Sequence, residues 1–249
     1  MLTAEGLLHL SELGVLHPDP LDRGLILLGV VHPELPRLDL ALLSIGRRDA
    51  ALLRLHDALF GPLIRAQAAC RHCGAQMELE LRVDELLATN RQGEPDQTEH
   101  RVTLGDHDVW FRLPSSADLQ EIRQFPDPEQ ASIMLIRRCV QGIRKGEADV
   151  PYEDLPPDVL SGLERAMDEL DRLADIRLEP TCPECGRSSA VIFDIVSFLW
   201  IKIAAQTRRL LRELDILARV YSWREADILA LSPIRRRTYV EMAESAIAV

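Results

Sequence analysis

Apolar residues recur at helical spacing over most of the chain. The longest such pattern runs from Ile195 to Tyr221 and predicts a single helix with one apolar stripe. That stripe consists of Val196, Leu199, Ile203, Leu210, Leu214, Leu217 and Tyr221. Similar patterns predict further helices in residues 20–31, 46–60, 115–122, 131–146, 158–175, 223–231 and 233–249. The protein should therefore be mostly helical.

Capping residues place the ends of several of these helices. Asp19 followed by Pro20 is typical of an N-cap and a first helical position, and Ser115 caps the helix after it. Ser222 and Glu225 have the spacing of a capping box before residues 223–231. Ser232 followed by Pro233 marks the start of the last helix.

Two short segments interrupt the helical pattern. Residues 89–100 are polar and rich in turn formers, which predicts a loop. The stretches RVTL and VWFRL, separated by GDHD, predict a short β-hairpin at residues 101–113.

Four of the five cysteines form two C-x-x-C-G motifs, Cys70 with Cys73 and Cys182 with Cys185. Two intervening residues let both sulfurs converge on one ion, and two such pairs supply the closed tetrahedral shell of a structural Zn²⁺. Redox-active cysteines are the alternative, although such a motif usually stands alone at the start of a helix. The fifth cysteine, Cys139, lies in an apolar stretch and is expected to be a buried thiol.

The two motifs lie in similar segments. Residues 64–87 and 176–199 align without a gap, and each predicts a strand, a knuckle, a strand and the start of a helix. Because neither half completes a metal site, the two should face each other as one zinc ribbon. We therefore expect an α+β, mostly helical fold, bundle-like around a small zinc ribbon with four cysteine ligands. Its parts are residues 1–63 (helical), 64–87 (first half-ribbon), 88–175 (inserted loop, hairpin and helices), 176–194 (second half-ribbon) and 195–249 (C-terminal helices).

Composition and charge narrow the functional classes. The formal net charge of −11 argues against a protein that binds nucleic acid by broad phosphate neutralisation. The N-terminal residues do not have the pattern of a secretory signal, and no apolar run is long enough to span a bilayer. We expect a cytoplasmic protein.

Catalytic motifs are lacking. The sequence contains no G-x-S-x-G, P-loop, G-x-G-x-x-G or H-E-x-x-H motif, and we expect no enzyme and no small-molecule substrate. His107, between two aspartates, could belong to a metal or acid–base site, but it fits a polar hairpin turn better. His72, inside the first knuckle, is an alternative metal ligand to a cysteine.

Arginines are concentrated in the C-terminal part of the chain, at positions 208, 209, 212, 219, 224 and 235–237. They could line solvent-exposed helix faces, paired with nearby carboxylates, or form a nucleic-acid face. They could also bind a protein partner, for which Arg235, Arg236 and Trp223 are the candidate contacts. Trp223 could equally lie in the core.

The stretch from Phe198 to Met242 resembles the end of the T-even-type phage baseplate hub assembly proteins, through the pattern Y-x-W-x-E-A-x-I-L-x-L-S at 221–232. The stretches FRLPSSADL and LSIGRRDAALLRLHDALFG and the paired knuckles resemble the bacterial branch of that family, encoded with contractile tails and injection systems. Ser222 stands where this family is expected to have glycine.

The resemblance implies a non-enzymatic assembly factor or minor component of a baseplate or hub, with baseplate proteins as partners. It also allows for incorporation into a phage tail-like particle. A zinc-ribbon protein that binds nucleic acid or has a regulatory role is the alternative. The resemblance carries over only the four cysteines as functional residues.

Overall fold

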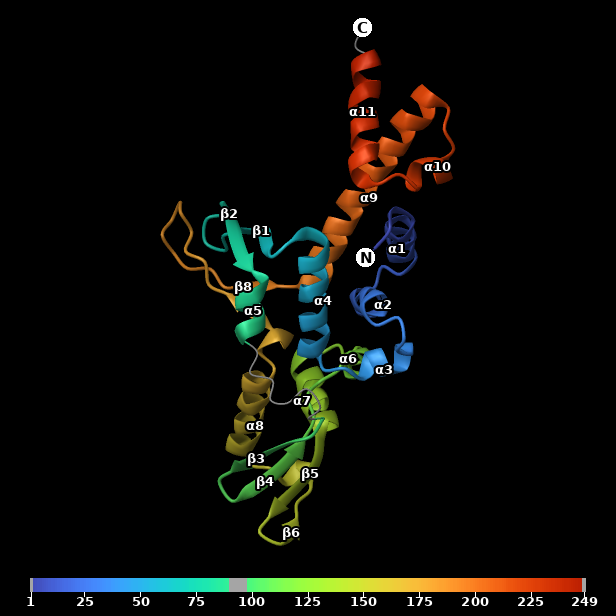
Figure 1. The fold of residues 1–249 in the computed structure, drawn as a ribbon. Helices are drawn as coiled ribbons and strands as arrows, with labels where there is room; N and C mark the ends of the chain where they lie inside the picture. Colours follow the sequence, from blue (N-terminus) through green and yellow to red (C-terminus); the bar gives the residue numbers. More distant parts are fainter. Residues whose placement is uncertain (1, 90–97, 248–249) are drawn as a thin grey trace. The chain divides into compact units, whose positions relative to one another are not determined.

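The computed structural model describes residues 2–89 and 98–247 (Figure 1). The chain is mixed α/β with helices predominating, which confirms the predicted helical character. It divides into two compact units, residues 1–26 with 196–249 (unit 1) and residues 27–195 (unit 2). The predicted loop at 89–100 lies mainly outside the described residues, and the five-part division of the chain stays a prediction.

Unit 1 consists of helices from the two ends of the chain. Its core contains Leu210, Leu214, Leu217 and Ile228, with Trp223 packed against them. The helices are α1 (Ala4–Leu16), the first part of α2 (Pro20–Val31), α9 (Ile195–Tyr221) from its second residue, α10 (Glu225–Leu229) and α11 (Pro233–Ile247). The predicted bounds of α9 and its buried apolar stripe are confirmed, with Tyr221 half-buried at the end.

Unit 2 begins within α2 and contains two β-hairpins that lie far apart in the sequence. The hairpins are β1 (Leu63–Ala69) with β2 (Gln76–Arg82), and β7 (Ile176–Leu178) with β8 (Val191–Phe193). The helices before and after the first hairpin are α3 (Arg37–Leu42), α4 (Ile45–Phe60) and α5 (Val83–Thr89). Gly61, with φ of 89°, ends α4 where the sequence predicts it.

The predicted hairpin at 101–113 forms half of a four-stranded antiparallel sheet in unit 2. The strand order is β3 (His100–Leu104), β4 (His107–Phe111), β5 (Val140–Lys145) and β6 (Ala148–Asp149). Two helices lie between β4 and β5 in the sequence, α6 (Ser116–Ile122) and α7 (Pro128–Cys139). After β6 come the 3-10 turn η1 (Tyr152–Asp154), helix α8 (Pro157–Leu170) and the 3-10 turn η2 (Arg172–Ala174).

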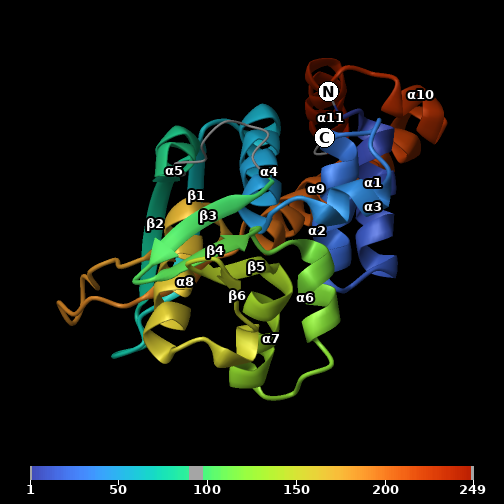
Figure 2. The same ribbon diagram turned by 90° about the horizontal axis from the view of Figure 1, so that it is seen from below.

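Helices α7 and α8 cover one face of this sheet (Figure 2). The shared core contains Val109, Phe111, Ile136, Ile143 and Leu163, together with the thiol of Cys139. Cys139 is fully buried, as the sequence predicts. Two helices and a sheet therefore form a core that does not involve the cysteine pairs.

The helix predicted over residues 131–146 is wrong in its second half. Helix α7 ends at Cys139, and residues 140–145 form β5, which pairs with β4. Val140 already has extended backbone angles, and Val109 of β4 pairs with Ile143, which is buried there. Burial of this apolar side chain on the sheet outweighs the helical spacing of the stretch.

The predicted capping box at Ser222 and Glu225 is also wrong. Arg224 precedes the first turn of α10, and its side chain makes no cap hydrogen bond. Ser222 instead terminates α9, because its N–H donates to the Ala218 carbonyl oxygen at 2.9 Å and its φ is 54°. This left-handed conformation is the one glycine adopts most easily at helix C-termini, which explains why glycine is expected at this position.

Candidate metal centre

Both C-x-x-C-G motifs form the same tight turn. The N–H of Gly74 donates to the Cys70 carbonyl oxygen, and the N–H of Gly186 donates to that of Cys182, each at 2.9 Å. Both glycines have positive φ, 76° and 70°, a conformation that residues other than glycine rarely adopt. Each turn therefore directs two cysteine side chains toward the same region.

The strands that flank the turns repeat the same register. Ile64 pairs with Leu81 in the first hairpin, and Ile176 pairs with Phe193 at the equivalent positions of the second. Helix α5 follows the first hairpin at Val83, and α9 follows the second at its equivalent, Ile195. The strand–knuckle–strand–helix repeat expected from the alignment is thus present in three dimensions.

The four sulfurs of the two motifs converge. The Sγ atoms of Cys70 and Cys185 lie 3.8 Å apart, and those of Cys73 and Cys182 lie 3.6 Å apart. All four Sγ atoms lie within 4.8 Å of one another. A tetrahedral Zn²⁺ with Zn–S bonds of about 2.3 Å requires sulfurs separated by about 3.8 Å. The donor set and its spacing therefore fit a zinc ion.

Hydrogen bonds from both halves surround Cys70. The backbone N–H of His72 donates to its Sγ at 3.4 Å, and the hydroxyl of Ser189 donates at 3.6 Å. The His72 N–H bond is the main reason why the pKa of Cys70 falls to about 6. Ser189 also accepts the N–H of Arg71 at 3.0 Å, so it links the two halves. These donors favour a thiolate, which is the form that binds metal.

The imidazole of His72 is not directed at the cysteines. Its Nε2 lies 3.2 Å from the carbonyl oxygen of Ser188, in the other half of the centre, where it can donate a hydrogen bond. His72 therefore bridges the two hairpins and leaves the four sulfurs as the ligand set. His107 is buried as the first residue of β4, directly after the hairpin turn and not within it. Its Nδ1 lies 2.8 Å from Asp106, a turn residue that also pairs with Lys145 at 2.7 Å.

The predicted partner-binding residues all lie in unit 1, in different environments. Trp223 is half-buried, stacked on Tyr221 at 4.8 Å and edge-on to Tyr239 at 5.0 Å. Arg236 is buried, and its Nε pairs with Glu213 at 2.7 Å. Arg235 is exposed. A role of these residues in binding a partner stays a prediction.

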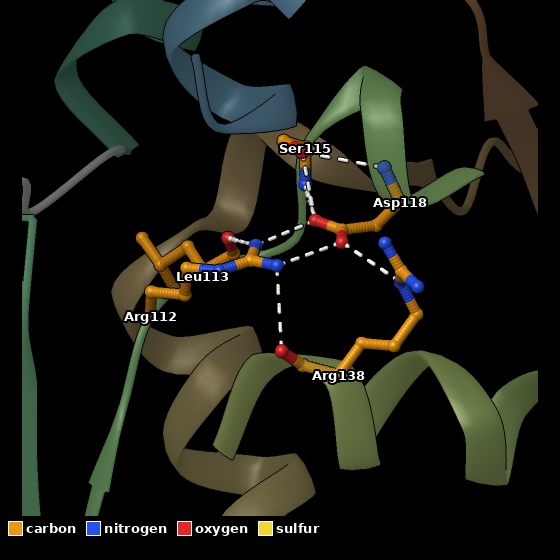
Figure 3. Close-up of polar contacts among 5 residues, drawn as sticks. All are labelled: Arg112, Leu113, Ser115, Asp118 and Arg138. Carbon is orange, nitrogen blue, oxygen red and sulfur yellow. Dashed lines mark hydrogen bonds and ion pairs between the residues drawn. The ribbon is translucent and has the colours of Figure 1, made fainter. Parts of the chain in front are cut away.

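A buried carboxylate that the sequence reasoning missed links β4, α6 and α7 (Figure 3). Asp118 is 1% exposed and accepts two hydrogen bonds from Arg112, at 2.5 and 2.7 Å. It also accepts one from Arg138 at 3.2 Å and two from Ser115, at 3.0 Å from the N–H and 2.7 Å from the hydroxyl. Burial would raise the pKa of Asp118, but the bonds from Arg112 and Ser115 outweigh it and hold the pKa well below its usual range.

Two stretches that carry the family resemblance meet beside this carboxylate, LSIGRRDAALLRLHDALFG and FRLPSSADL. The N–H of Ile45 donates to the Pro114 carbonyl oxygen at 2.9 Å, and Arg48 donates to the Ser116 hydroxyl at 3.3 Å. Arg48 also donates to Asp49 at 2.7 Å, but burial dominates and raises the pKa of Asp49 to about 6. These two stretches therefore form a polar junction within unit 2.

A second buried aspartate caps α4 from a distant part of the chain. Asp171 lies 125 positions beyond Gly46 in the sequence, and its Oδ2 accepts a hydrogen bond from the Gly46 N–H at 3.0 Å. A Cβ on Gly46 would lie 1.6 Å from the Asp171 carboxylate, so only glycine fits. The S-x-x-D spacing of Ser115 and Asp118 could have indicated a capping box, whereas no local pattern indicates this long-range cap.

The family model described as "T4 bacteriophage base plate protein" matches residues 30–200, more than half of the chain. The chain belongs to this family. The match nearly coincides with unit 2 and includes all four cysteines of the candidate metal centre. No curated protein and no solved structure matches the chain.

The family predicted from the sequence is thus confirmed by a match that covers the middle of the chain. The resemblance at residues 221–232 lies beyond the matched residues, in unit 1. Membership of the T4 baseplate protein family supports a baseplate-related structural or assembly role. Within the described residues, no helix is long and apolar enough to cross a membrane.

Proposed function

We propose that this protein is a non-enzymatic assembly factor or minor structural component of the baseplate or hub of a phage-like contractile tail. The family match over residues 30–200 is the observation that carries the proposal. The ion pairs and hydrogen bonds of Arg48, which is buried, and of Arg112, which is half-buried, are consistent with it, because they join elements of unit 2 and hold the fold together. The protein would act through its surfaces on other baseplate proteins, in the cytoplasm or in the finished particle.

We further propose that one Zn²⁺ per chain binds to Cys70, Cys73, Cys182 and Cys185. Four thiolates leave no coordination position for water or substrate, so the role of the ion would be structural. It would join the β1–β2 hairpin to the β7–β8 hairpin, reinforcing the bonds that Ser188 and Ser189 make between them. Metal binding would then contribute directly to the folding free energy of unit 2.

The C-terminal helices would supply the surface that contacts a baseplate partner. Trp223 and Arg235 would contribute directly, since tryptophan and arginine are frequent anchors of protein interfaces. Arg236 would support this surface through its ion pair with Glu213, which joins α11 to α9.

The function is tested by identifying what the tagged protein binds in its native host. Affinity purification followed by mass spectrometry is compared with the protein content of isolated tail particles. Baseplate proteins in the eluate, with the protein also in the particles, are expected for a structural component. Baseplate proteins in the eluate alone indicate an assembly factor. Recovery of polymerase subunits or DNA without tail proteins would overturn the proposal.

A further inference from the structure

Helix α9 exposes one line of side chains on the face opposite its buried stripe. Ile201 is 65% exposed, Arg208 follows it two turns later, and Arg212 lies one further turn along. Residues seven and four positions apart lie on the same side of a helix. This face of α9, defined by Ile201, Arg208 and Arg212, presents an apolar side chain followed by two positive charges.

Among the described residues, Arg208 and Arg212 differ from neighbouring arginines in having no carboxylate partner. Arg209 pairs with Glu213 at 3.1 Å, and Arg219 pairs with Asp215 at 2.8 Å. In the part of the chain that the structure describes, no carboxylate lies within ion-pair distance of Arg208 or Arg212. The Nε of Arg212 donates instead to the Arg208 carbonyl oxygen, at 3.3 Å.

Two like charges one turn apart repel each other and destabilise a helix. A negatively charged surface that docks on Arg208 and Arg212 would remove this repulsion. The exposed Ile201 would gain from the same contact by burial of its side chain. The face therefore has the composition of an interface with an acidic partner.

The complementary arrangement occurs on α8 of the same chain. Glu164 and Asp168 are exposed and one turn apart, the spacing of Arg208 and Arg212. Among the described residues, no basic side chain forms an ion pair with either carboxylate. The surrounding residues 147–184 contain twelve acidic and three basic side chains, so this segment of the chain carries a net negative charge.

We propose that Arg208 and Arg212 on α9 of one copy pair with Glu164 and Asp168 on α8 of a second copy. The spacing and the signs of charge match, and Ile201 adds an apolar contact beside the charged pairs. Because the α9 surface and the α8 surface differ, each copy carries both, and successive copies would associate head-to-tail. This assigns the protein a self-association surface, beyond the binding of baseplate proteins.

Sedimentation velocity on the full-length, metal-loaded protein tests the contact. Self-association should depend on protein concentration and should weaken about tenfold from low to high salt, because exposed charges are screened. Arg208→Glu with Arg212→Glu should abolish it, and so should Glu164→Arg with Asp168→Arg. An equimolar mixture of these two double variants should associate again. The unchanged α8 of the first variant then meets the unchanged α9 of the second, and the two reversed surfaces also meet each other.

Arg54→Glu with Arg224→Glu is the matched control, since both arginines are exposed and form no ion pair among the described residues. This control should associate like the wild type, and all variants should keep the wild-type thermal unfolding. A chain that stays monomeric at every concentration would overturn the proposal. So would loss of association in the control, or failure of the mixture to associate.

A second probe separates a protein contact from a phosphate contact. A fluorescein-labelled DNA duplex should not bind at near-physiological salt, as judged by fluorescence anisotropy. Tight binding that is lost in Arg208→Glu with Arg212→Glu would assign this face to nucleic acid and overturn the proposal.

Discussion

Asp118→Asn should strongly destabilise unit 2. The substitution keeps the size and shape of the side chain but removes the charge that Arg112 and Arg138 share. Asparagine also replaces one accepting oxygen with an NH2 group; at the Oδ2 position this places a donor against the donors of Arg112 and Ser115. Two guanidinium groups are then left without their counter-charge in a site where the carboxylate is 1% exposed.

The size of the destabilisation expected for Asp118→Asn depends on how deeply the three charged groups are buried. Removing one partner of a fully buried ion pair costs about 3–5 kcal/mol. The side chains of Arg112 and Arg138 are 32% and 40% exposed, so water can solvate part of their charge. We therefore expect a loss of about 2–3 kcal/mol in the free energy of unfolding, or roughly 5–10 °C in Tm.

The effect should depend on pH in a defined direction. The folded-state pKa of Asp118 is held below its unfolded value of about 3.9. The stability that Asp118 contributes is therefore complete above that value and is lost as the pH falls through the folded-state pKa. The free energies of unfolding of the wild type and of Asp118→Asn should differ most at neutral pH and should converge in acid.

Thermal unfolding followed by circular dichroism, repeated from neutral to acidic pH, measures both effects. Asp149→Asn is the matched control, because Asp149 pairs with Arg144 at 3.1 Å but is 85% exposed. That exposed pair should contribute less than about 1 kcal/mol. The reasoning is refuted if the two variants unfold alike, or if the difference between Asp118→Asn and wild type is the same at every pH.

Three further predictions concern other parts of the structure. Cys182→Ser should lower the zinc content measured by elemental analysis, whereas Cys139→Ala should leave it at the wild-type level because that thiol lies in a separate core. Gly46→Ala should cost about 3 kcal/mol or more in urea unfolding, since its Cβ would overlap the Asp171 carboxylate; a neutral result would show that this cap is not close-packed. Ser222→Gly should raise the free energy of unfolding by roughly 1 kcal/mol, because it relieves a left-handed backbone; a lower Tm would contradict that account.

The sequence predicts those parts of the fold whose determinants are local. The apolar stripe of α9, the glycine that ends α4 and the two C-x-x-C-G turns all have patterns contained in a few adjacent residues. The convergence of the cysteine pairs is also predictable, because neither pair alone can complete a tetrahedral site.

The remaining features depend on contacts that no local pattern encodes. Strand β5 follows α7 without a break, and its residues extend because β4 offers an edge and an apolar core. Asp171 caps Gly46 across 125 positions, and Ser189 reaches Cys70 across 119. Such polar partners are decided by the tertiary fold, so a single sequence contains no spacing that identifies them.

The most direct test of the account is the metal content and coordination of the purified protein. Native mass spectrometry should show one zinc ion per chain, and X-ray absorption should show four sulfur neighbours at about 2.3 Å. Complete chelation should then separate the two hairpins and lower Tm, since metal binding contributes to folding. A metal-free chain with wild-type stability, or a zinc ion with nitrogen or oxygen ligands, would contradict a centre built from Cys70, Cys73, Cys182 and Cys185.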